Sequence, residues 1–239
     1  GNAVALLQSD LKRLLAYSSI AHAGYLMVGI TAAFAGGEKG IALYHGAESV
    51  LFYLAAYAFM TLGAFGVILA LRTRDGRPAT TIDDLAGLGW TNRIPALGLT
   101  VCLLSLMGFP PLAGFFGKLQ IFAAAFSAVD GEEAGSLKLL AIVGMLNAAV
   151  GAFYYLRIIV LMYFGTPAEP LVATGGWPVA LAAGACASLS VLIGIAPESL
   201  SRACRDAAIA ANTRPAAAVE LPPAVVGSAE PAATQVARD

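Results

Sequence analysis

The chain has 239 residues, of which 59% are hydrophobic and only 12% are charged, with a mean hydropathy of +0.77 and a formal net charge of −1. Soluble domains carry about 25% charged residues, so this chain cannot cover a water-facing surface of ordinary polarity. The composition excludes an ordinary soluble domain, the near-zero charge gives no sign of nucleic-acid binding, and the long uncharged runs indicate an integral membrane protein.

The N-terminal stretch GNAVALLQSDLKRLL is typical of the end of a transmembrane span followed by a polar connection, SDLKR, which is called the SDLKR corner below. Residues 1–13 are assigned to the end of that upstream span and to this corner. We therefore expect the chain to be the C-terminal part of a longer polytopic protein. A crossing helix needs about 20 apolar residues, which places the first span at 14–36, with Ser9 or Asp10 as its cap. Asp10 and Lys12 are expected to form an ion pair at this corner, and proton uptake is the alternative role.

A second apolar run predicts a span at 47–71. The polar link RTRDGRPATTIDDLAGLGWTNR follows it. Within this link, Thr80 or Thr81 is expected to cap a short interfacial helix, because Asp83 and Asp84 would then occupy its first turn and favour its N-terminus.

The third apolar region, 94–128, is too long for one straight crossing. As a continuous helix it would extend about 52 Å, whereas the hydrocarbon core is about 30 Å thick. Pro110 and Pro111 remove two backbone donors, and Gly108 and Gly114 flank them with permissive backbone. These residues predict a hinge, and backbone that breaks at membrane depth is tolerated only inside protein or beside a wet cavity.

Lys118 follows this hinge by one turn. It lies about ten residues, or about 15 Å, before the polar DGEE corner, which is beyond the reach of a lysine stem. A central lysine costs about 2.5–3.5 kcal/mol on insertion scales. We interpret Lys118 as a proton carrier that changes between its protonated and neutral forms, with a purely structural, paired lysine as the alternative.

The remaining apolar runs predict spans at 137–164 and 177–195. Residues 197–211 form an amphipathic pattern, and 212–239 lack periodicity and aromatic residues, which is typical of disorder. The sequence therefore predicts an all-α polytopic transmembrane bundle over residues 14–196, with about five spans and one broken helix.

Other polar groups lie inside the predicted spans. His22 follows Ser18 and Ser19 by one turn, and it is either hydrogen-bonded scaffolding or a proton relay. Tyr154 and Tyr155 belong either to an interfacial aromatic belt or to the same relay.

The short loops divide their basic residues unevenly between the two sides of a five-span arrangement. Lys39 and Lys138 lie on one side, and the larger set lies on the other: Lys12, Arg13, Arg72, Arg74, Arg77 and Arg93. The positive-inside rule then places the SDLKR corner in the cytoplasm and the C-terminus outside.

Four stretches occur together and in one order: SDLKRLLAYSSIAHAGY, DLAGLG, LLSLMGFPPLAGFFGKL and GAFYYLRIIVLMYF. In this combination the chain resembles the antiporter-like membrane subunits of respiratory complex I over roughly residues 1–196. Within that family it is most similar to the subunit N group of bacterial NADH:quinone oxidoreductases. FPPLAGFFGK keeps a lysine where subunit M-like chains tend to carry glutamate, and 47–71 lacks the histidine-rich pattern of subunit L-like and Mrp antiporter chains.

The resemblance implies an inverted-repeat fold of which this chain holds the second unit and the final helix. It places Lys118 on the proton exit side of a central polar axis. It also implies a proton-translocating subunit of an enzyme complex in the bacterial inner membrane, surrounded by lipid and by neighbouring antiporter-like and small membrane subunits. NADH, FMN, iron–sulfur clusters and quinone would belong to partner subunits, so we expect no cofactor, metal or redox chemistry in this chain. An Mrp-type cation/proton antiporter subunit or a membrane hydrogenase relative is the alternative.

Overall fold

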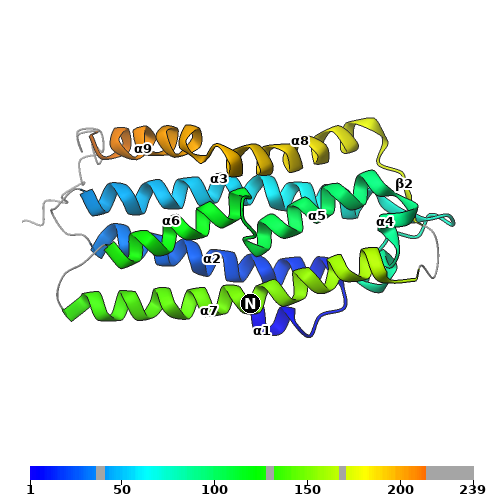
Figure 1. Ribbon diagram of the computed structural model, residues 1–239, viewed down its shortest axis with the longest axis horizontal. Coiled ribbons are helices and arrows are strands. Elements are labelled where there is room, and N and C mark those ends of the chain that lie inside the picture. The colour runs from blue at the N-terminus through cyan, green and yellow to red at the C-terminus, as the bar shows by residue number, and fades with distance from the viewer. Residues whose placement is uncertain (36–40, 128–131, 167–170, 214–239) are drawn as a thin grey trace, which may run out of the picture.

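The computed structural model describes residues 1–35, 41–127, 132–166 and 171–213, which form a bundle of long helices (Figure 1). The elements in chain order are α1 (Asn2–Ala5), α2 (Leu11–Ala35), α3 (Ile41–Ala70), β1 (Leu71–Thr73), η1 (Asp83–Leu85), α4 (Leu88–Thr91), α5 (Arg93–Met107), α6 (Ala113–Ser127), α7 (Glu132–Phe164), β2 (Leu171–Ala173), α8 (Gly176–Ile195) and α9 (Pro197–Thr213). The helices that are long and apolar enough to cross a membrane are Leu11–Ala35, His45–Ala70, Gly135–Phe164 and Gly176–Ile195. The predicted all-α membrane bundle is confirmed.

The broken helix supplies the fifth crossing. Helices α5 and α6 have 15 residues each, or about 22 Å apiece, so neither alone spans a core of about 30 Å. They follow one another along the bundle with an irregular segment between them (Figure 1). The interruption covers residues 108–112, inside the stretch from Gly108 to Gly114 in which the prolines and glycines predict it.

Several helices extend beyond the predicted apolar spans. Helix α3 begins six residues before the predicted start at residue 47, and its first described turns contain His45 and Glu48. Only the apolar part of this helix was predicted, and the helix also includes the residues before it, some of which are polar. Helix α9 extends to Thr213, so the first two residues of the predicted tail are helical, while residues 214–239 lie outside the described part of the chain.

Short backbone pairings join the segments at one end of the bundle. Strand β1 pairs antiparallel with β2, and Asp10 forms an isolated bridge with Thr81. Leu11 N–H donates to Thr80 O at 2.8 Å, and Ile82 N–H donates to Ser9 O at 2.9 Å. These pairings hold the start of α2 against the polar link that follows α3. Neither strand was predicted, because each has only three residues and its partner lies about 100 positions away in the sequence.

The polar link is held by Asp84. Its carboxylate accepts the N–H groups of Thr80 at 2.9 Å and Thr81 at 2.8 Å, and Arg77 Nη2 donates to it at 3.2 Å. Burial alone would raise the pKa of Asp84, but the hydrogen bonds from Thr81, Thr80 and Arg77 outweigh it and hold the pKa below its usual value. As predicted, a short helix, η1, has Asp83 and Asp84 in its first turn. Its N-cap residue is Ile82 rather than the predicted Thr80 or Thr81, although the Thr81 hydroxyl accepts the Asp84 N–H at 3.3 Å.

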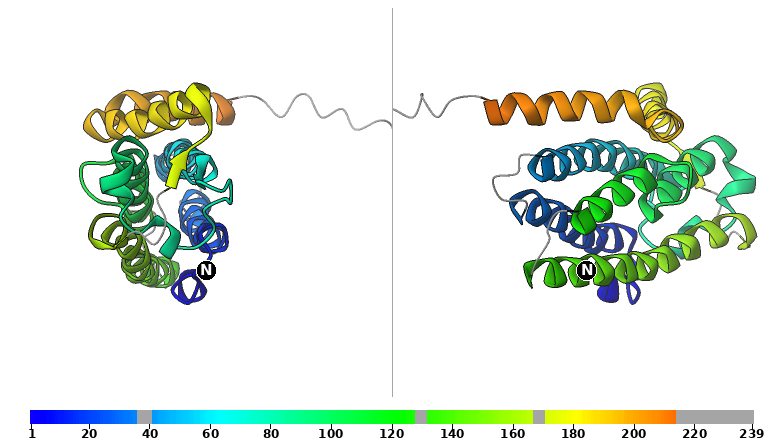
Figure 2. Two further views of the ribbon diagram at one scale, coloured as in Figure 1. Left: turned by 90° about the vertical axis from the view of Figure 1, so that its right-hand side faces the viewer. Right: turned by 60° about the vertical axis from the view of Figure 1, so that its left-hand side comes forward.

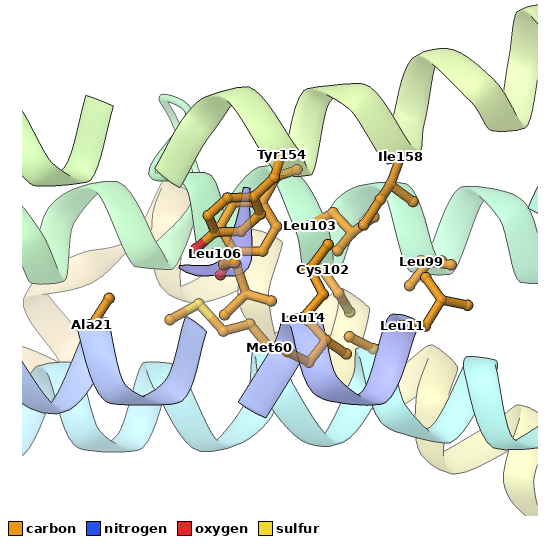
Figure 3. Close-up of a cluster of buried hydrophobic side chains, with 14 of the residues drawn as sticks. Leu11, Leu14, Ala21, Met60, Leu99, Cys102, Leu103, Leu106, Tyr154 and Ile158 are labelled. Carbon is orange, nitrogen blue, oxygen red and sulfur yellow. The ribbon is translucent and has the colours of Figure 1, made fainter. Parts of the chain in front are cut away.

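The buried core lies between α2, α3, α5 and α7 (Figure 3). Leu11 and Leu14 of α2, Met60 of α3 and Leu99 of α5 are at most 1% exposed. Outer faces are instead strongly apolar, and Leu146 and Phe153 of α7 are more than 60% exposed. Large apolar patches of this kind mark a surface that meets lipid or other protein, which agrees with a membrane chain.

Candidate functional site

The break between α5 and α6 is a built feature of the backbone. Gly108 ends α5 with a left-handed backbone, φ 90°, which a residue with a side chain rarely adopts. The Pro110–Pro111 peptide bond is cis. Gly114 N–H donates to Ser105 Oγ at 3.1 Å, and a Cβ added at Gly114 would overlap the Ser105 carbonyl. The hinge residues thus let the two half-helices approach each other closely.

Lys118 lies directly against the carbonyl end of α5. Its Nζ donates to Leu106 O at 2.7 Å and to Met107 O at 3.0 Å, and the side chain is 8% exposed. Nζ also lies 5.4 Å from the centroid of the Tyr25 ring. The last carbonyls of a helix lack intrahelical donors and carry the negative end of its dipole, so they form a site for a cation. The break therefore creates the site that the lysine occupies.

A hydrogen-bonded chain of polar side chains centres on His22, which is 2% exposed. His22 Nε2 lies 3.2 Å from Tyr155 Oη, and Nδ1 lies 2.6 Å from Tyr53 Oη. The Tyr155 hydroxyl is also hydrogen-bonded to Ser18 Oγ. A neutral imidazole offers one donor and one acceptor, so it joins the two tyrosines into a continuous path for a proton.

A second set of contacts connects α7 to the N-terminal segment. Tyr154 Oη donates to Asn2 Oδ1 at 2.8 Å. Asn2 Nδ2 in turn lies 3.1 Å from Tyr25 Oη and 2.6 Å from the Asn147 carbonyl oxygen. The rings of Tyr154 and Tyr155 lie 4.4 Å apart, so this set lies beside the His22 chain. Both tyrosines are buried, and their side chains point into the bundle.

Helix α6 brings Lys118 close to the His22 chain because Gly117 faces Tyr53. A Cβ added at Gly117 would lie 2.5 Å from Tyr53 Cδ2, so any larger residue would push α6 away from α3. Lys118 and His22 contact the same side chain, because Lys118 Nζ lies 5.4 Å and the His22 ring centroid 5.6 Å from the centroid of the Tyr25 ring. Two predicted residues from distant parts of the sequence thus lie beside one aromatic ring.

The structure does not bring Asp10 and Lys12 into this cluster. Asp10 Oδ1 accepts the Arg13 N–H at 2.8 Å and so caps α2, as Asp10 or Ser9 was predicted to do. The expected Asp10–Lys12 ion pair is wrong: it is not among the ion pairs of the described residues, and side chains two positions apart do not face each other on a helix. Twelve helical positions, or about 18 Å, separate Asp10 from His22.

Three members of the cluster were missed in the sequence: Tyr53, Tyr25 and Asn2. Tyr25 follows His22 by three residues, a spacing that places both on one helix face and was a usable signal. Tyr53 lies in an apolar run with no pattern that shows its direction. Asn2 precedes the polar corner and meets Tyr154 only through the tertiary fold.

Apart from Asn2, the cluster consists of lysine, histidine, tyrosine and serine side chains, all of which exchange protons with hydrogen-bonded neighbours. Among the residues that the structure describes, no three His, Cys, Asp or Glu side chains are placed to hold a metal ion. The chemistry that these groups support is movement of a proton between buried sites.

Comparison with known proteins gives a consistent result. Residues 1–131 match the family described as NADH:quinone oxidoreductase/Mrp antiporter, transmembrane. The chain is 43% identical over 197 residues to NADH-quinone oxidoreductase subunit N of Rhodospirillum rubrum, covering 82% of this chain and 37% of the relative. It is 47% identical over 196 residues to NADH-quinone oxidoreductase subunit N 2 of Roseiflexus castenholzii, covering 81% and 36%. The chain thus spans a little over a third of the length of these curated relatives.

Solved structures share the fold. A chain of respiratory complex I from Thermus thermophilus with bound aureothin has a TM-score of 0.66 and 33% identity, covering 85% of this chain and 42% of that chain. A chain of the Mrp complex from Dietzia sp. has a TM-score of 0.68 at 20% identity, covering 87% and 44%. The second likeness shows the fold alone.

Proposed function

The chain belongs to the NADH:quinone oxidoreductase/Mrp antiporter transmembrane family, and from this premise we propose that it is part of a proton-translocating membrane subunit of an NADH:quinone oxidoreductase. Relatives named subunit N, 43% and 47% identical over four-fifths of the chain, support this assignment over an Mrp-type antiporter. The subunit works beside other membrane subunits of the complex. Oxidation of NADH and reduction of quinone, with FMN and iron–sulfur clusters, take place in partner subunits.

The contact of Lys118 with the broken helix carries the proposal. The ammonium is stabilised by the two carbonyls at the end of α5, and a neutral amine loses most of that charge–dipole attraction. A small separation of the half-helices, or a new charge beside them, therefore changes whether Lys118 keeps its proton. The break therefore couples a conformational or electrostatic change to the uptake or release of a proton by Lys118.

The His22 chain supplies neighbouring proton sites. A proton on Ser18 or Tyr155 reaches Tyr53 through the imidazole by successive transfers along hydrogen bonds. Tyr154 lies beside this path, with its ring centroid 4.4 Å from that of Tyr155, and is the neighbouring proton site of the proposal. Uptake at Asp10 and Lys12 is the remaining part of the proposal, and the distance of about 18 Å along α2 requires water molecules between that corner and His22.

The chain is a multi-pass membrane chain of bacterial complex I type. We further propose that the end of the bundle that contains the SDLKR corner faces the cytoplasm of a bacterium, with the bundle in the inner membrane. The start of α2 and the link after α3 meet at that end and carry most basic residues of the short connections, which supports this orientation.

Lys118 substitutions in the assembled complex test the function. Lys118→Ala is expected to assemble, to oxidise NADH with quinone and to lose proton pumping in proteoliposomes. Lys118→Arg is the discriminating variant, because a guanidinium caps the carbonyls but does not release a proton near neutral pH. Lys118→Arg is therefore expected to assemble like Lys118→Ala and, like it, to lose pumping.

Lys138→Ala is the matched control, since Lys138 lies in α7 near the opposite end of the bundle from the strands and should leave pumping unchanged. Assembly is followed by native electrophoresis and pumping by a pH-sensitive dye. Normal pumping in an assembled Lys118→Ala or Lys118→Arg complex would contradict the carrier role and favour a structural lysine.

A further inference from the structure

Helix α9 lies along α3 and contributes few buried apolar side chains to the contact between them. It follows α8 after a turn at Ala196 and packs on the part of α3 that lies away from the strands (Figures 1 and 2). Its inward face consists of Leu200, Cys204 and Ala208, which recur every four residues, and only Cys204 and Ala208 are buried. The apolar contact of α9 thus comes from few of its own side chains: Cys204 packs in a buried cluster with Phe52 of α3, and the partly buried Leu200 packs against that cluster.

A buried carboxylate on α3 forms the polar contacts that hold α9. Glu48 of α3 is 5% exposed, and both of its oxygens bond to α9. Arg205 Nε donates to Oε2 at 2.9 Å and Nη2 donates to Oε1 at 3.3 Å, while Ser201 Oγ donates to Oε1 at 2.5 Å. His45, one turn away on α3, lies 3.9 Å from Oε2. A two-point guanidinium–carboxylate contact is the strong and geometrically specific kind.

The α8–α9 segment also touches the broken helix. Cys204 belongs to one buried cluster with Phe52 and Ala56 of α3 and Ala113, the first residue of α6. Gly194, near the end of α8, lies against the break itself, and an added Cβ would lie 2.6 Å from Leu112 Cα. The corner between α8 and α9 therefore contacts the segment that joins the two half-helices, which ends at Leu112, six residues before Lys118.

We propose that Glu48, Ser201 and Arg205 form a latch that docks α9 on α3 and thereby positions the broken helix that carries Lys118. Glu48 and Arg205 are positioning residues, since they act through α9 and the break. The docking of α9 on α3 is inferred from these contacts alone. Its effect on proton transfer at Lys118 rests on the proposed function. Separating α9 from α3 would leave the buried Glu48 carboxylate without its partners, which costs free energy. Docking of α9 therefore depends on the latch.

Cys204 is a natural reporter of docking, because it lies on the docked face and is 7% exposed. In the assembled complex, Arg205→Met is expected to speed alkylation of Cys204 by N-ethylmaleimide about tenfold or more, measured by mass spectrometry of its peptide. Arg202→Met is the matched control. Arg202 lies on the same helix, its Nε donates to the Glu198 carbonyl oxygen at 3.3 Å, and its substitution should leave the rate unchanged.

Arg205→Met is preferred to Glu48→Gln for this measurement. Burial raises the pKa of the Cys204 thiol and the Glu48 carboxylate raises it further, so removing Glu48 would speed labelling even with α9 docked. Arg205→Met keeps that charge, and faster labelling then reports exposure. Cys102, fully buried in the main core, is an internal standard and should remain slow.

Proton pumping tests the positioning role. Arg205→Met and Glu48→Gln are expected to pump less per NADH and to shift the pH dependence of pumping, while Arg202→Met matches the wild type. The exchanged pair Glu48→Arg with Arg205→Glu should recover both readouts in part. Should Arg205→Met fail to assemble, Ser201→Ala removes one bond and is expected to give the same changes at smaller size.

The outcomes separate the two parts of the proposal. Unchanged labelling in Arg205→Met and Ser201→Ala overturns the latch. Faster labelling with unchanged pumping and pH dependence overturns the positioning role. If Lys118→Arg pumps normally, the proposed function fails, whereas the labelling result still decides whether the latch docks α9.

Discussion

The hydrogen bond between Tyr53 and His22 leads to a stability prediction with a defined magnitude. Tyr53 is fully buried, and its hydroxyl lies 2.6 Å from His22 Nδ1. Tyr53→Phe keeps the ring that packs against Gly117 and removes only the hydroxyl. The buried imidazole nitrogen then loses this partner, which costs about 1–3 kcal/mol. At about 2–4 °C per kcal/mol for a domain of this size, the melting temperature should fall by about 2–12 °C.

Tyr57→Phe is the matched control on the same helix. Its hydroxyl donates to Ser19 Oγ at 2.8 Å in a half-buried site, where the loss should stay near about 0.5–1.5 kcal/mol. The assay is the temperature at which the subunit leaves the purified complex, followed by native electrophoresis. A fall for Tyr53→Phe that is no larger than for Tyr57→Phe would refute the reasoning, because the buried nitrogen would then not depend on Tyr53.

Two further substitutions test the polar link and the hinge. Asp84→Asn should lower the free energy of unfolding by about 1 kcal/mol at pH 7. Hydrogen bonds hold the Asp84 pKa below its unfolded value, so this stabilisation is present above about pH 4 and is lost as the pH falls through the folded pKa. The thermal unfolding of variant and wild type should therefore converge on further acidification, and a difference that stays constant would contradict this. Gly114→Ala should block assembly, because the added Cβ overlaps the Ser105 carbonyl. Gly135→Ala is the control: its Cβ meets nothing within 4 Å, so this variant should assemble normally in native gels. Equal assembly of the two variants would show that the half-helices can separate.

Local patterns in the sequence predicted most of the helices and the break. An apolar run predicts a span because its length as a helix matches or exceeds the thickness of the hydrocarbon core. The break is predicted by two prolines and two glycines, which change the backbone near them and depend little on the rest of the chain. The first turns of α3 were missed for the same reason, since hydropathy marks the apolar part of a helix and not its polar end. Asp10 was correctly predicted as one of two possible caps, yet its pairing with Lys12 was wrong because the Asp10 carboxylate turns back to cap α2, while Lys12 projects from the first turn of that helix in another direction.

The candidate site was only partly predictable. Lys118 and His22 stood out because a charged or titratable group inside an apolar run is costly and therefore conspicuous. Their partners did not stand out. Tyr53 differs from other aromatic residues of α3 only in the direction of its side chain, and Asn2 meets Tyr154 across 152 positions of sequence.

The sequence alone determined that this chain crosses a membrane several times and that one crossing is interrupted beside a lysine. These properties follow from the transfer cost of polar groups and from backbone chemistry at single positions. Only the tertiary structure decided what the lysine faces: the free carbonyls of its own broken helix, with the His22 chain on one side. It also decided that Glu48 holds α9 and that the α8–α9 corner rests on the break. Such contacts depend on how helices pack and rotate against one another, which no local pattern specifies.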